Sequence, residues 1–129
     1  MKVVPGRVVG HVVQKIEYAY VLIEAEGVGE EADHGDWDSE VSAAHAIAGS
    51  VAIAVRAPIE GEVDVRVLRA VPQEELLPLL VFAGRLESPG GGFVICDPLN
   101  TFRIEFVSSG TFEVRVDDHQ AAEVQVLLG

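Results

Sequence analysis

The side chains best able to catalyse a reaction or bind a metal ion are four histidines and one cysteine. The histidines are His11, His34, His45 and His119. Their spacing matches neither H-E-x-x-H nor H-x-H. His34 and His45 could still share a zinc ion with a nearby carboxylate, which would be Asp33 or Asp36. Cys96 has no second cysteine to pair with, which excludes an internal disulfide, and we expect it to be a small core residue.

Other catalytic and metal-binding patterns are incomplete. The chain has no G-x-S-x-G motif for a serine nucleophile. Asp36, Asp38 and Glu40 share the spacing of the first calcium ligands of an EF-hand. However, Val41 stands where that loop requires Gly, and Ile47 stands where it requires Glu. We therefore predict a protein that is not an enzyme, with no metal and no cofactor.

The charge of the chain is strongly acidic and unevenly distributed. Nine Lys and Arg residues face 21 Asp and Glu residues, for a formal net charge of −12. Nucleic acids and anionic membranes are therefore not expected as partners, because binding them requires cations. Nine of the acidic residues lie between Lys15 and Arg56, where the chain has no other Lys or Arg. This segment is compatible with a basic protein partner, although solubility alone explains acidity in most proteins.

The most acidic region contains DHGDWDSE, Asp33 to Glu40, which sets the only Trp of the chain between aspartates. Trp37 could fold back to close an open edge of the fold, with a neighbouring carboxylate accepting its indole N–H. It could instead anchor a partner, because Trp is enriched among the residues that dominate binding energy. On that interpretation the candidate partner-binding residues are Asp33, Asp36, Trp37, Asp38 and Glu40.

Short runs of β-branched and aromatic residues, separated by Gly, Pro, Asp and Ser, predict successive strands. The runs lie at 8–13, 18–25, 51–55, 63–68, 79–86, 93–96 and 123–128. Val51 to Val55 combines β-branched and small residues and could be buried on both faces. Helical signals are weak: Pro72 to Leu77 predicts one or two turns, and Ser39 to Ala48 could be helical or extended. We predict an all-β, antiparallel two-layer β-sandwich with little helix, formed by residues 1–129 as one domain.

A hairpin is predicted near the end of the chain. Its apolar positions alternate with charged ones and are Phe102, Ile104, Phe106, Phe112, Val114 and Val116. Placing Phe106 opposite Phe112 leaves the three-residue loop 108–110, whose last residue is Gly110. In that register Arg103 lies diagonal to Glu113, and Glu105 lies diagonal to Arg115.

The sequence shows no targeting or spanning segment. Met1 to Gly10 lacks the uninterrupted apolar core of a signal peptide. The longest apolar runs are too short to cross a membrane as a helix. We therefore expect a cytoplasmic protein.

The order of these features resembles the competence protein J (ComJ) family. Proteins of that family carry an early strand beginning with Tyr, an acidic motif around D-W, a strand of small and β-branched residues, and a final hairpin. The matching pieces here are Tyr18 to Val21, Asp36 to Glu40, Ser50 to Val55 and Phe102 to Val116. The acidic motif is the most specific piece, although here an acid precedes the hydroxyl residue, which is the reverse of the family's order.

The ComJ family inhibits a nuclease of DNA uptake, so the resemblance implies a non-catalytic protein that inhibits a basic nuclease. An enzyme that cuts DNA must hold a polyanion, and an acidic inhibitor would compete for the same groove. An alternative function is a β-sandwich that binds a small ligand or carbohydrate in a concave apolar pocket. Two further alternatives are a metal-dependent hydrolase using the histidines and a structural subunit that associates through open sheet edges.

Overall fold

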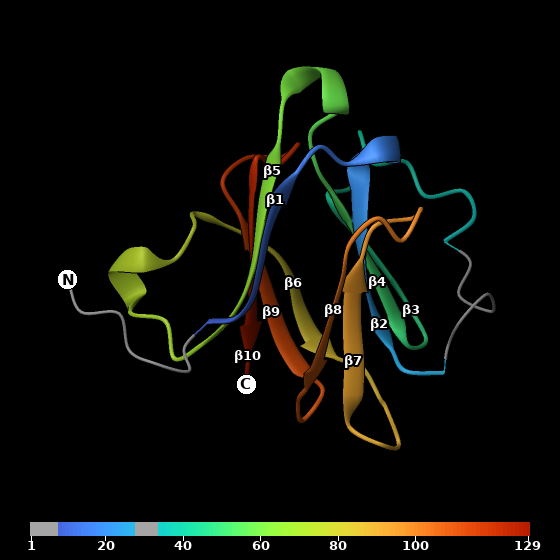
Figure 1. Ribbon diagram of the computed structural model, residues 1–129, viewed down its shortest axis with the longest axis vertical. Coiled ribbons are helices and arrows are strands. Elements are labelled where there is room, and N and C mark those ends of the chain that lie inside the picture. Colours follow the sequence, from blue (N-terminus) through green and yellow to red (C-terminus); the bar gives the residue numbers. More distant parts are fainter. Residues whose placement is uncertain (1–7, 28–33) are drawn as a thin grey trace.

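Two five-stranded sheets pack face to face in the structure, a computed structural model that describes residues 8–27 and 34–129 (Figure 1). The first sheet contains, in spatial order, β1 (Val8–Gln14), β5 (Val63–Arg69), β10 (Glu123–Leu128), β9 (Thr111–Val116) and β6 (Leu79–Arg85). The second contains β3 (Ala44–Ile47), β4 (Ser50–Ala54), β2 (Tyr20–Ala25), β7 (Gly92–Cys96) and β8 (Arg103–Val107). β5 and β10 run parallel, and the other neighbours run antiparallel. The predicted two-layer β-sandwich is confirmed.

Helical structure within the described residues is limited to three short 3-10 turns. They are η1 (Glu17–Ala19), η3 (Pro58–Glu60) and η4 (Gln73–Glu75). η4 lies where the sequence predicted one or two helical turns, from Pro72 to Leu77, and it is a single turn. The segment from Ser39 to Ala48, which could have been helical or extended, forms turns followed by β3. No helix in the described part of the chain is both long and apolar enough to cross a membrane.

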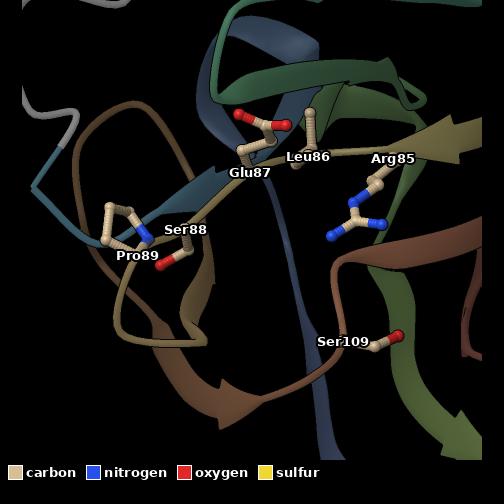
Figure 2. A pocket seen from close by; sticks show the side chains of 6 residues that line it. All are labelled: Arg85, Leu86, Glu87, Ser88, Pro89 and Ser109. Carbon is tan, nitrogen blue, oxygen red and sulfur yellow. The ribbon is translucent and has the colours of Figure 1, made fainter.

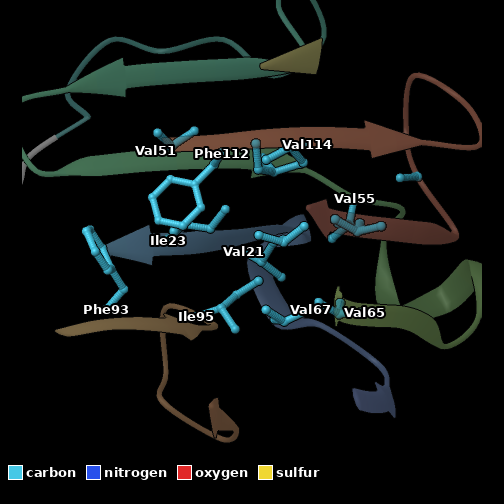
Figure 3. Close-up of a cluster of buried hydrophobic side chains, with 14 of the residues drawn as sticks. Val21, Ile23, Val51, Val55, Val65, Val67, Phe93, Ile95, Phe112 and Val114 are labelled. Atoms are coloured by element: carbon cyan, nitrogen blue, oxygen red, sulfur yellow. The ribbon is translucent and has the colours of Figure 1, made fainter. Parts of the chain in front are cut away.

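The core lies between the sheets and is filled by inward-facing Val, Ile and Phe side chains (Figure 3). Val21 and Ile23 enter it from β2, and Phe112 and Val114 enter it from β9. Of the six side chains predicted to share one core, five are buried, and Ile104 packs against their cluster. This part of the prediction is confirmed.

The predicted hairpin between β8 and β9 is wrong. β8 pairs with β7 in the second sheet, whereas β9 pairs with β10 and β6 in the first. Residues 108–110 therefore carry the chain from one sheet to the other. Phe106 and Phe112 meet across the core, with ring centroids 6.0 Å apart, instead of as neighbours in one sheet. Alternation of apolar residues shows which side of each strand faces the core, and a hairpin and a crossover share that alternation.

The diagonal neighbours predicted from the hairpin register are consequently wrong as well. Arg103 Nε lies 3.1 Å from a carboxylate oxygen of Glu105, within its own strand. Arg115 Nε lies 3.8 Å from a carboxylate oxygen of Glu113, again within one strand. All four side chains are at least partly exposed, so these pairs contribute little to stability.

Candidate functional site: the acidic loop over the second sheet

The outer face of β4 is made of small side chains and is covered. Side chains alternate across a strand, so Val51 and Ile53 enter the core while Ser50, Ala52 and Ala54 point outward. None of these three outward residues is more than 2% exposed. The prediction that this strand is buried on both faces is confirmed, and another part of the chain must cover its outer side.

Residues 34–43, here called the Trp37 loop, supply a cover for this face. The Trp37 ring meets Tyr20 of β2 edge-on, with centroids 5.7 Å apart, and lies nearly parallel to His45 of β3, with centroids 6.3 Å apart. Since β2 and β3 flank β4, the indole lies over the small side chains of β4. The indole N–H donates to the backbone oxygen of Ser42 at 3.0 Å. Trp37 thus folds back onto the sheet, but its acceptor is a backbone carbonyl and not a carboxylate.

Backbone hydrogen bonds hold the loop in two consecutive turns. The backbone N–H of Trp37 donates to the carbonyl of His34 at 3.1 Å, and that of Ser42 donates to the carbonyl of Asp38 at 3.0 Å. The carboxylate of Asp38 accepts the backbone N–H of Glu40 at 2.9 Å. Short side-chain acceptors of this kind stabilise turns. The loop is therefore ordered by its own bonds as well as by the buried side of Trp37.

A chain of four polar side chains fixes the base of the loop. Ser50 Oγ donates to Glu24 at 3.1 Å and lies 2.8 Å from His34 Nε2. The Nδ1 atoms of His34 and His45 are 2.9 Å apart. Because Ser50 donates its proton to Glu24, the contact with His34 is a donation from Nε2–H to Ser50 Oγ. One proton lies between the two Nδ1 atoms, on one ring or the other. These contacts link Glu24 of β2, Ser50 of β4 and His45 of β3 to His34 of the loop.

The same residues are poorly arranged for the catalysis that they superficially suggest. A serine nucleophile needs its hydroxyl proton directed at a histidine base. Here the Ser50 proton is directed at Glu24, and Ser50 is 0% exposed, so a substrate cannot reach it. His34 and His45 do come together, as the zinc candidate required. Within residues 8–27 and 34–129, however, no group of three or more His, Cys, Asp or Glu side chains could hold a metal ion.

The candidate partner-binding residues differ in their exposure to solvent, and one of them is not described by the structure. Asp36, Asp38 and Glu40 are exposed on the Trp37 loop. Trp37 is half-buried, so part of its ring remains at the surface. Asp33 lies outside the described residues. The loop therefore presents three carboxylates around one aromatic ring that is held in place from below.

Sequence reasoning missed the residues on which the loop rests, namely Tyr20, Glu24 and Ser50. Tyr20 and Glu24 belong to the outward-facing set of β2, and the alternation of that strand could have revealed them. Burial, together with Tyr18 and Glu24 nearby, raises the pKa of Tyr20. Its phenol consequently stays protonated against the indole edge across the neutral pH range.

Cys96 is buried, as the sequence predicted. Burial, reinforced by Glu24, raises the pKa of its thiol to about 11, although Arg103 opposes the shift. Only the thiolate reacts, so we expect Cys96 to react with a disulfide reagent at pH 8 roughly 100-fold more slowly in the native protein than in urea. Absorbance of the released thiolate measures both rates. Equal rates would contradict the buried position of Cys96.

One surface pocket bears on the alternative of a small-ligand or carbohydrate site. It lies at the turn after β6 and is lined by Arg85, Leu86, Glu87, Ser88, Pro89 and Ser109 (Figure 2). Its volume of about 240 Å³ is below the range of roughly 300–1,000 Å³ usual for ligand pockets. No aromatic ring lines it for a sugar to stack on, so this pocket does not favour that alternative.

Comparison with known proteins identifies a shared fold. No family model matches the chain, and no curated protein matches it in sequence. Among solved structures, the chain is similar to the crystal structure of ComJ from Bacillus subtilis, described as an inhibitor of the DNA degrading activity of NucA. The TM-score is 0.67 at 13% sequence identity, over 95% of this chain and 96% of that one. The ComJ-like fold implied by the sequence resemblance is confirmed.

Proposed function

We propose that this protein is a non-catalytic inhibitor of a basic nuclease and that it binds the enzyme through the Trp37 loop. The observation that carries the proposal is the exposure of Asp36, Asp38 and Glu40 on a loop fixed by its own hydrogen bonds. Carboxylates held in one place lose little conformational freedom when a partner binds. The fold shared with a nuclease inhibitor supports the choice of partner class.

The charge of the loop fits a groove that binds DNA. A nuclease holds its substrate with Lys and Arg side chains that neutralise phosphates. Three loop carboxylates can occupy part of that groove and exclude the polyanion. Inhibition then requires no chemistry from the inhibitor, which agrees with the position of Ser50 beneath the loop.

Inhibition of DNA cleavage tests this proposal directly. The purified protein is added to NucA and, separately, to the DNA-degrading activity in a lysate of the cells that encode the chain. We expect dose-dependent loss of cleavage in at least one assay, weakening as salt rises. The Debye length falls from roughly 30 Å at 0.01 M to about 8 Å at 0.15 M, so electrostatic attraction fades over that range. Full cleavage in both assays at a large excess of protein would refute the proposal.

A charge reversal then assigns the inhibition to the loop. Asp36→Lys with Asp38→Lys should lower the association rate constant roughly tenfold at low salt, because steering acts before contact. Stopped-flow mixing with the inhibited nuclease measures that rate. The matched control is Glu74→Lys with Glu87→Lys, which changes net charge equally at exposed sites on η4 and the β6–β7 turn. Equal effects of the two double variants would mean that only net charge matters.

A further inference from the structure

The most exposed large apolar side chains gather at one end of the sandwich. Among the described residues, four such side chains are more than 60% exposed: Ile59 at 95%, Val41 at 80%, and Tyr18 and Val107 at 69% each. Tyr18 lies on η1, Ile59 on η3 and Val41 in the Trp37 loop. Figure 1 shows these three segments at the same end of the two sheets. Val107 alone lies away from them, at the end of β8.

Contacts between the segments make this end one continuous surface. η1 and η3 touch each other. Tyr20, which directly follows η1, packs edge-on against Trp37 with centroids 5.7 Å apart. The exposed rings and methyl groups of Tyr18 and Ile59 therefore extend the surface of the Trp37 loop.

Both apolar side chains are presented by turns that the fold holds firmly. Tyr18 follows the fully buried Ile16 and has a φ of 64°, a conformation that bulky residues rarely adopt. The carbonyl of Ala19 accepts the backbone N–H of Val55 at 3.0 Å. Around Ile59, the backbone N–H of Glu60 donates to the carbonyl of Ala57 at 2.9 Å. An unfavourable backbone conformation that exposes an aromatic ring to water is typical of a binding surface.

The charges around these side chains indicate the kind of partner that covers them. Exposed acids on the two turns and the loop are Glu17, Glu60, Glu62, Asp36, Asp38 and Glu40. The nearest cations in sequence are Lys15, Arg56 and Arg66. Arg56 Nε donates to the backbone oxygen of Glu62 at 2.9 Å, and Arg66 Nε lies 3.1 Å from a carboxylate oxygen of Asp64. A second copy of this chain would bring like charges together and is disfavoured. A partner that carries a basic surface with an apolar depression would be complementary to the acidic residues and the exposed apolar side chains at this end of the protein.

We infer that Tyr18 and Ile59 insert into the nuclease beside the groove that the Trp37 loop occupies; this inference rests on the proposed function. The loop carboxylates attract the enzyme, and the two apolar side chains slow its release. Tyr is among the residues enriched at the energetic centres of interfaces, because it buries a rigid ring and keeps a polar hydroxyl.

The test compares Tyr18→Asn, Ile59→Ser and the matched control Val107→Ser. Asn tolerates the left-handed backbone at position 18, and all three side chains are mostly in water, so the unfolding midpoints should stay near that of the wild type. We expect each of the first two changes to raise the dissociation rate from the inhibited nuclease roughly tenfold or more. Val107→Ser should change it less than twofold.

Three other outcomes overturn the inference in distinguishable ways. If Tyr18→Asn and Ile59→Ser dissociate like the wild type while the Asp36 and Asp38 reversal weakens binding, the inference fails and the proposed function stands. If the wild type inhibits neither nuclease preparation, both fail together. If light scattering shows a dimer that Ile59→Ser dissociates, this end binds a second copy instead of a basic enzyme.

Discussion

Replacing Gly110 with alanine is expected to lower the free energy of unfolding by roughly 3 kcal/mol or more. Gly110 is buried in the crossover between β8 and β9 and has a φ of 96°, which L-residues rarely adopt. A Cβ there would collide with the backbone oxygen of Leu86. The backbone N–H of Leu86 donates to the carbonyl of Gly110 at 2.8 Å, so the two segments cannot separate without losing this bond.

Gly90→Ala is the matched control for this change. Gly90 also lies in a turn of the sandwich, but it has no positive φ, and a Cβ there meets nothing within 4 Å. Its stability in urea should stay within about 0.5 kcal/mol of the wild type. A loss of only about 1 kcal/mol for Gly110→Ala would match the backbone conformation alone. That result would mean that the Leu86 segment moves aside and that the predicted collision costs nothing further.

The crossover illustrates why strand neighbours were harder to predict than strand faces. Alternation in the sequence placed Phe106, Phe112 and Val114 on a common core, and they are there. The same alternation satisfies a hairpin in one sheet and a crossover between two, since both direct the same side chains inward. What decides between them is the competition of β7 and β10 for pairing, and these strands lie outside the local pattern.

The parallel pairing of β5 with β10 was also beyond local reasoning. Val63, Val65 and Val67 alternate with Asp64 and Arg66, and the strand predicted at 63–68 is present as β5. Nothing within that strand specifies that Glu123 to Leu128 pairs beside it in the same direction. This pairing joins segments far apart in the chain, and it depends on how all the strands of the sandwich are arranged.

The sequence offered the candidate residues of the site but not the residues that support them. The acidic segment and its single Trp stand out from composition alone. The resting place of Trp37, between Tyr20 and His45, depends on the order β3-β4-β2 in the second sheet. The small outward residues of β4 were a usable signal, because a strand of small and β-branched residues needs a cover on its outer face.

Trp37→Ala is expected to lower stability and weaken nuclease binding together. The half-buried ring covers the outer face of β4, so its loss should lower the free energy of unfolding by roughly 2 kcal/mol, less than the 3–5 kcal/mol of a fully buried Trp. Most of the protein then remains folded, since typical domains are stable by about 5–15 kcal/mol. Circular dichroism in urea measures this loss.

Trp37→Phe distinguishes the contribution of the aromatic ring from the contribution of the indole hydrogen bond. Phe keeps an aromatic ring between Tyr20 and His45 but cannot donate to Ser42, whose carbonyl is near solvent. We expect it to lose about 1 kcal/mol of stability. It should hold the loop well enough to keep most of the binding.

The binding rates of these variants decide what the Trp37 ring does. If the ring positions Asp36, Asp38 and Glu40, then Trp37→Ala should raise the dissociation rate from the nuclease roughly tenfold, because a loop that the ring no longer holds gains conformational freedom on leaving the enzyme. Trp37→Phe should stay within a few-fold of the wild type, since the loop keeps its place. Suppose instead that Trp37→Ala destabilises the fold while reversal of Asp36 and Asp38 leaves nuclease binding unchanged. Trp37 would then serve only to cover β4, and the contact surface would have to lie elsewhere on the molecule.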